Sequence, residues 1–114
     1  MAKSGWAKKR GTKSEYLVRN IFRGAGWAVV RSGGSLGPVD LVCMRKGHVL
    51  LVQVKRKAKG PLYLTDEVPE RVQGFRVALV ADFGRGNVRV VPKKHRVDPR
   101  EGTPLREFLA SNWS

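Results

Sequence analysis

The feature that most constrains the fold of this chain is a short apolar run, Val49 to Val52, which follows a Lys46-Gly47 pair. A strand that is apolar on both faces belongs in the middle of a sheet, because only there are both of its faces covered. Lys46-Gly47 has the composition of a tight turn, so it predicts that residues 39–45 pair antiparallel with residues 48–57. The hairpin indicates a chain organised around a central sheet.

The other elements surround this hairpin in a mixed order. Apolar residues at helical spacing predict helices over residues 12–25 and 104–112, and a shorter helix is expected over residues 65–74. Strands are expected over residues 27–31, 39–45, 48–57, 75–82 and 87–91. This order predicts an α/β fold, a single domain with a central mixed five-stranded β-sheet flanked by α-helices.

The length of 114 residues leaves room for one compact domain. We expect that domain, over residues 12–114, to follow a flexible basic N-terminal arm over residues 1–11. No apolar run approaches the roughly 20 residues of a membrane span, and the basic N-terminus lacks the apolar stretch of a signal peptide. The expected location is therefore cytoplasmic, and no membrane partner is expected.

The chain is strongly basic, with 23 Lys and Arg against 9 Asp and Glu and a formal net charge of +14. Such a surplus repels itself, and a polyanionic partner is its usual explanation. The first 65 residues contain fourteen cations but only two acids, Glu15 and Asp40. Two isolated carboxylates would repel a phosphate backbone unless a divalent cation lies between them and the phosphate. We therefore expect a nucleic-acid partner and no small-molecule substrate.

The chain has few residues suited to a disulfide, a thiolate site or a histidine metal site. Cys43 is the one cysteine of the chain, which excludes a disulfide framework and a thiolate zinc site. The two histidines, His48 and His95, are far apart in the sequence, which argues against a histidine metal centre.

The two acids of the basic half also have ordinary structural interpretations. Glu15 can close a capping box that begins at Thr12, and Asp40 can be an ordinary residue at the exit of the Gly37-Pro38 turn. For each acid taken alone, the structural interpretation and a catalytic role are about equally good. The position of the acids relative to other residues has to decide between the two.

That relation comes from the central hairpin. Gln53 and Lys55 are two residues apart on one strand, so both side chains point to the same face. A turn at residues 46–47 sets Asp40 opposite about Gln53 or Val54, so Asp40, Gln53 and Lys55 can converge at one end of the hairpin. A carboxylate, an amide oxygen and a backbone carbonyl suit a hard cation. A neighbouring lysine can orient a metal-bound water and offset the charge that develops on a phosphate.

The spacing Asp-x(12)-Gln-x-Lys, formed by Asp40, Gln53 and Lys55, resembles the core of the PD-(D/E)xK nucleases. More closely, the chain resembles the archaeal-type Holliday junction resolvases, the Hjc-like proteins. The resemblance covers about residues 10–65 and rests on several motifs in order. These are Gly11–Glu15, Gly26–Ser35, Val39–Val42, Val52–Lys55 and Leu62–Leu64.

The resemblance implies a restriction-endonuclease-like core and a Mg²⁺-dependent endodeoxyribonuclease that resolves four-way junctions as a homodimer, by paired symmetric hydrolysis. One or two Mg²⁺ ions per site, with Mn²⁺ as a substitute, would be held by Glu15, Asp40, Gln53 and the Val54 carbonyl. Lys55 would position the attacking water, and Ser35 with Arg31 would hold the phosphates that flank the scissile bond. The residues expected to contact DNA are Arg10, Lys13, Arg31, Ser35, Arg56, Lys57 and Lys59.

Two positions depart from the family pattern. Gln53 stands where most members have a glutamate, and a neutral amide is a weaker ligand for Mg²⁺. Tyr16 stands where many members have an arginine after the glutamate, which removes one phosphate contact. Two alternatives therefore stay open: another DNA endonuclease of the PD-(D/E)xK superfamily, and a catalytically weakened basic DNA-binding module.

Overall fold

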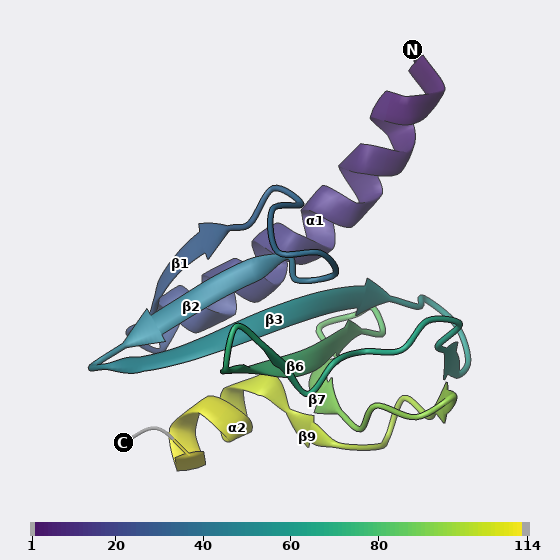
Figure 1. The fold of residues 1–114 in the computed structure, drawn as a ribbon. Coiled ribbons are helices and arrows are strands. Elements are labelled where there is room, and N and C mark those ends of the chain that lie inside the picture. Colours follow the sequence, from purple (N-terminus) through teal and green to yellow (C-terminus); the bar gives the residue numbers. More distant parts are fainter. Residues whose placement is uncertain (1, 113–114) are drawn as a thin grey trace.

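The computed structural model describes residues 2–112 of the chain, with side chains described from residue 13 to residue 111 (Figure 1). The helices are α1 (Ala2–Gly24) and α2 (Leu105–Asn112). The strands are β1 (Ala28–Arg31), β2 (Leu41–Arg45), β3 (His48–Arg56), β4 (Leu62–Tyr63), β5 (Arg71–Val72), β6 (Phe75–Asp82), β7 (Val88–Val91), β8 (Arg96–Val97) and β9 (Thr103–Pro104).

The strands form a mixed sheet in the order β1-β2-β3-β6-β7-β9, with β5 also paired to β6. Strands β3 and β6 run parallel and the other neighbours run antiparallel. The predicted α/β domain with a central mixed sheet is confirmed, and the expected strands are its long ones. The sheet has seven strands rather than five, because two two-residue strands, β5 and β9, extend it. Strands β4 and β8 form a separate pair.

The central hairpin has the predicted geometry. Lys46 and Gly47 both have left-handed backbones, with φ of 48° and 83°, as a two-residue type I′ turn requires. Leu41 pairs with Val52, and the Asp40 N–H donates to the Val52 carbonyl at 2.8 Å. One residue beyond the Leu41 pair, Asp40 therefore lies beside Gln53, as the spacing predicted.

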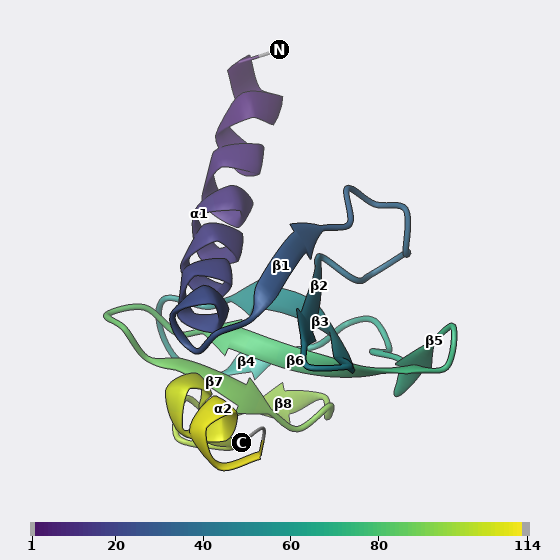
Figure 2. The same cartoon turned by 90° about the vertical axis from the view of Figure 1, so that its left-hand side faces the viewer.

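Both helices cover the same face of the sheet. Val18 and Phe22 of α1 and Leu105 of α2 belong to one buried cluster with Val52 and Val80 of the strands. The opposite face is covered by chain without helix: a second cluster joins residues of β6, β7 and β8 to Leu62, Leu64 and Val68. Figure 2 shows α1 and α2 on one side of the strands. The helices that flank the sheet therefore lie on one of its faces.

The helix predicted over residues 65–74 is absent. Residues 64–70 form an irregular segment, and β5 then turns into β6 through Gln73 and Gly74, whose φ values of 51° and 84° make a second type I′ turn. Pro69 lacks the N–H that a helix needs at this point, and Val68 packs onto the sheet from the irregular segment. Tertiary packing replaces local helix propensity here.

Helix α1 begins earlier than predicted. A single helix runs from Ala2 to Gly24, so residues 2–11 form its first turns, which project beyond the sheet (Figure 1). Met1 lies outside the described residues, and the division into an arm and a domain stays a prediction. No helix in the described part of the chain has the length and apolarity needed to cross a membrane.

Candidate active site

The candidate site lies where β2 begins and β3 ends. Asp40 directly precedes β2, and its Oδ2 accepts the Val54 N–H at 2.7 Å. Its own N–H is bound to the Val52 carbonyl, so both the backbone and the carboxylate of Asp40 are fixed to β3. The remaining carboxylate oxygen, Oδ1, is the one that this anchoring leaves for a ligand.

Helix α1 contributes Glu15, whose side chain is 18 % exposed. Its Oε1 accepts a hydrogen bond from Arg31 Nε at 2.9 Å, and Arg31 Nη2 forms an ion pair with the same oxygen at 2.9 Å. Arg31 is the last residue of β1 and lies opposite Leu41, the residue after Asp40. This charge-assisted fork holds Glu15 at the same end of the sheet as Asp40.

The electrostatics of Asp40 show that the predicted residues act on one another. Burial raises the pKa of the Asp40 carboxyl, and the hydrogen bond from the Val54 N–H opposes that shift. The negative charge of Glu15 raises the same pKa further, whereas the positive charges of Lys55 and Arg31 lower it. The four side chains predicted from the sequence therefore form one electrostatic cluster, in which burial disfavours the charged form of Asp40.

Gln53 is buried, with 7 % of its surface exposed, and its Oε1 has no hydrogen-bond partner among the described residues. A buried carbonyl oxygen without a donor is costly, and a cation would satisfy it. The described residues contain no group of three His, Cys, Asp or Glu suited to a metal ion. The third oxygen donor of the candidate site is an amide, which such a group does not include, and the oxygen donors of Glu15, Asp40 and Gln53 do fit a hard cation.

Ser35 belongs to the glycine-rich turn between β1 and Asp40. Its hydroxyl donates to the Ser32 carbonyl at 2.6 Å, and the Ser32 hydroxyl donates to the Val39 carbonyl. The structure therefore places Ser35 on an exposed loop next to the site, with its hydroxyl bonded inside that loop and not to Asp40 or Glu15.

The predicted DNA-contacting cations lie on the surface around the same end of the sheet. Lys13, Lys57 and Lys59 are exposed, and Arg56 is exposed while its Nη1 lies 3.4 Å from the Asp82 carboxylate. The side chain of Arg10 lies outside the described residues.

The sequence did not identify two polar residues beside the site, Ser14 and Asp82. Both are 2 % exposed, and the Ser14 hydroxyl donates to Asp82 Oδ2 at 2.9 Å. Ser14 directly precedes Glu15 and lies on the same helical stripe as Val18 and Phe22, which are fully buried. A polar residue on a buried stripe was the one sequence signal that could have found this pair.

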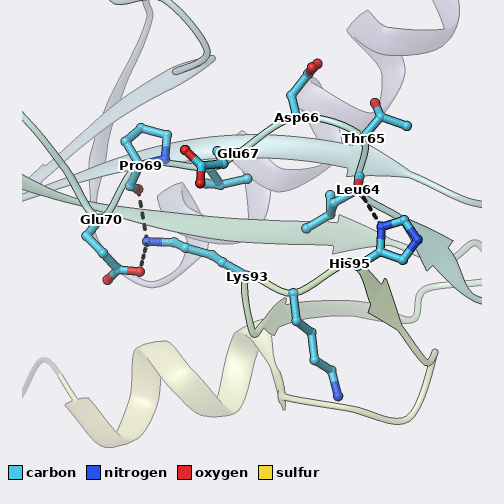
Figure 3. A pocket seen from close by; sticks show the side chains of 10 residues that line it. Leu64, Thr65, Asp66, Glu67, Pro69, Glu70, Lys93 and His95 are labelled. Carbon is cyan, nitrogen blue, oxygen red and sulfur yellow. Dashed lines mark hydrogen bonds and ion pairs between the residues drawn. The ribbon is translucent and has the colours of Figure 1, made fainter.

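A cavity of about 470 Å³ lies elsewhere, between residues 64–70 and residues 93–95 (Figure 3). The Lys93 ammonium occupies one wall, 3.1 Å from the Pro69 carbonyl and 3.4 Å from the Glu70 carboxylate. None of the predicted site residues lines this cavity.

Comparisons with known proteins agree with this arrangement. The family model described as archaeal Holliday junction resolvase (Hjc) matches residues 6–100. The crossover junction endodeoxyribonuclease Hjc of Methanocaldococcus jannaschii is 36 % identical over 67 residues, which are 59 % of this chain and 50 % of that protein. The chain thus spans about half the length of this curated relative.

Among solved structures, the chain is similar in fold to the Hjc of Archaeoglobus fulgidus, described as a Holliday junction resolvase from an archaeal hyperthermophile. The TM-score is 0.67 at 19 % identity, and the match covers 86 % of this chain and 98 % of that one.

Proposed function

Because the chain belongs to the archaeal Holliday junction resolvase family, we propose that it is a Mg²⁺-dependent endonuclease that cuts four-way DNA junctions by hydrolysis of phosphodiesters. The observation that best supports this proposal is the buried, unpartnered Gln53 oxygen beside the anchored carboxylate of Asp40. An orphaned acceptor next to a carboxylate is expected where a cation binds.

The proposed ligands are the carboxylates of Asp40 and Glu15, the amide oxygen of Gln53 and the carbonyl oxygen of Val54. When bound, Mg²⁺ would polarise the scissile phosphate and lower the pKa of a water molecule. Manganese would serve as a substitute. The proposal includes one or two ions per site, and the residues around Asp40 supply enough oxygen ligands for the first ion.

The cations of the site have two separate tasks. Lys55 follows Gln53 on the same face of β3 and acts electrostatically on Asp40, so its ammonium would orient the attacking water and offset charge on the phosphate. Arg31 is 45 % exposed even while it pairs with Glu15, so it is accessible to a phosphate that competes for its guanidinium. Ser35 would add a hydroxyl contact to the flanking phosphate once its loop meets DNA.

The surface cations supply the remaining affinity. Lys13, Arg56, Lys57 and Lys59 surround the site, and such contacts make binding to DNA strongly dependent on salt. We propose that two copies of the chain act together, because a two-fold homodimer matches the two-fold symmetry of a four-way junction and would place two cuts symmetrically.

The experiment compares a labelled four-way junction with the matching linear duplex, in Mg²⁺ or in chelator. Paired symmetric nicks in the junction that require Mg²⁺ are the expected result. Equal cutting of the duplex would instead indicate another endonuclease of the superfamily. Asp40→Asn should abolish cutting and preserve binding, whereas Asp98→Asn, at an acid paired with Arg96 away from the site, should change neither.

One observation favours a second candidate, a DNA-binding module with weakened catalysis. The third ligand is neutral, and Arg31 already neutralises Glu15, so the site attracts cations less than a site with three carboxylates. Tight junction binding without cleavage, restored to cleavage by Gln53→Glu, would establish this second candidate.

A further inference from the structure

Asp82, the last residue of β6, is a buried carboxylate that belongs to no proposed ligand set. Its Oδ2 accepts the Ser14 hydroxyl at 2.9 Å and lies 3.4 Å from Arg56 Nη1. Its Oδ1 accepts the Gly84 N–H at 2.9 Å, and its carbonyl accepts the Lys57 N–H at 2.9 Å. The side chain thus joins helix α1, the end of β3 and the turn after β6.

Burying a carboxylate is costly, and the cation that the described residues place beside Asp82, Arg56, is itself half-exposed. The hydrogen bonds of this carboxylate have a structural effect, because each of them fixes a separate element relative to the end of β6. Ser14 is itself buried, so neither partner of the Ser14–Asp82 bond can exchange it for water.

The bond acts on α1 at the level of the candidate site. Ser14 continues the stripe of Val18 and Phe22 that packs onto the sheet, and Glu15 is the next residue. A rotation or a shift of the helix that broke the Ser14 bond would also move the Glu15 carboxylate, since the two residues are adjacent in the helix. Asp82 and Arg31 therefore hold this level of α1 from two different strands.

We propose that Asp82 is a positioning residue: acting through Ser14, it fixes the height and rotation of α1 so that the Glu15 carboxylate stays beside Arg31 and Asp40. The importance of that position for catalysis rests on the proposed function, whereas the position itself does not. Substituting a residue that holds a metal ligand in place typically lowers metal affinity about 10- to 100-fold.

The test uses Ser14→Ala, which removes one hydroxyl and leaves Asp82 with Gly84 and Arg56. The first readout is the Arg31 Nε–H resonance in NMR, which the bond to Glu15 protects from exchange with water. We expect this protection to be lost in Ser14→Ala. The second readout is Mn²⁺ binding to the DNA-free protein, followed by the paramagnetic resonance of free Mn²⁺, and we expect binding to weaken about tenfold.

Three further variants separate positioning from general loss of stability. Ile21→Val removes a methyl group from the packed face of the same helix and should leave both readouts unchanged. Ser14→Thr retains the hydroxyl and should retain both. Asp82→Asn retains an acceptor oxygen and should come closer to the parent protein than Ser14→Ala does.

Protection of Arg31 and binding of Mn²⁺ that are as strong in Ser14→Ala as in Ile21→Val would overturn the proposal. Neither readout needs DNA or cleavage. A protein that never cuts a junction would therefore refute the proposed function, while the role of Asp82 would still be decided by the Arg31 resonance.

Discussion

Replacing Gln53 by Glu changes the charge of the candidate metal site with almost no change of shape. Glu15 and Asp40 supply two negative charges, and Arg31 and Lys55 supply two positive charges that act on Asp40. The metal-free site is thus formally neutral, and Gln53→Glu makes its charge −1. The added charge lies at the position where the unpartnered Oε1 now lies.

The size of the effect follows from the burial of this position, which is 7 % exposed. Two unit charges about 4 Å apart contribute about 4 kcal/mol at an effective dielectric constant of 20, and more when one ion is divalent. Dehydrating the new carboxylate offsets much of this gain. A net gain of about 1.5–3 kcal/mol remains, so Mg²⁺ or Mn²⁺ should bind on the order of 10- to 100-fold more tightly.

The same substitution should destabilise the metal-free protein at neutral pH. Burial and the charge of Glu15 already raise the pKa of Asp40, and a second buried carboxylate beside it would raise the pKa values of both. The folded protein then binds protons that the unfolded chain has released, so stability falls as the pH rises from the unfolded pKa towards the folded pKa. The deficit of Gln53→Glu should shrink in acid and on addition of Mg²⁺.

Titration calorimetry with Mn²⁺ measures the affinity, and thermal unfolding with and without Mg²⁺ measures the stability. Gln73→Glu is the matched control, because it makes the same chemical change at an exposed turn between β5 and β6. Tighter binding in Gln53→Glu alone is the expected result. Equal affinities in the parent protein and Gln53→Glu would refute the assignment of the Gln53 oxygen as a ligand.

Three further substitutions test other parts of the molecule. Asp40→Asn should raise the melting temperature of the metal-free protein at neutral pH, because burial raises the pKa of Asp40, and the gain should vanish as the pH falls to the ordinary value of 3.8; a lower melting temperature at neutral pH would contradict this. Arg31→Gln should tighten the binding of Mn²⁺, because it frees Glu15, but weaken the binding of DNA and lower its salt dependence by about one phosphate contact. Changes of both affinities in the same direction would argue against the use of Arg31 by both Glu15 and DNA. Phe22→Ala, at a fully buried ring packed edge-on against Trp27, should cost about 3–5 kcal/mol in urea unfolding; a loss below about 1 kcal/mol would mean that α1 is not held by this core.

The parts of the fold that were predicted correctly are those that local patterns determine. A two-residue turn fixes the register of its hairpin, so residues 46–47 were enough to place Asp40 beside Gln53. Helical spacing shows that a helix has an apolar stripe, but it does not say which face of the sheet receives the stripe. For that reason the shared face of α1 and α2 was missed, as were the two-residue strands β5 and β9, which are too short to show any period.

The residues of the candidate site also differ in whether local sequence patterns could predict their position. Asp40, Gln53 and Lys55 belong to one hairpin, so spacing alone brings them together. Glu15 comes from a separate helix, and its place beside Asp40 depended on the family resemblance. The Ser14–Asp82 bond joins residues 68 positions apart, and Asp82 ends an apolar strand as an ordinary polar residue would. Only the packing of α1 on the end of β6 could show that the two meet.

The neutrality of the site links its two proposed ligands. In the DNA-free protein Arg31 is bound to Glu15, which lowers the attraction of the site for a cation. A phosphate that draws Arg31 away leaves Glu15 charged and adds oxygen donors of its own, so DNA should increase the affinity for metal. Linkage then requires that metal increase the affinity for DNA by the same factor. In a chain whose first 65 residues are strongly basic, a neutral amide at position 53 would thus make the loading of metal depend on bound DNA.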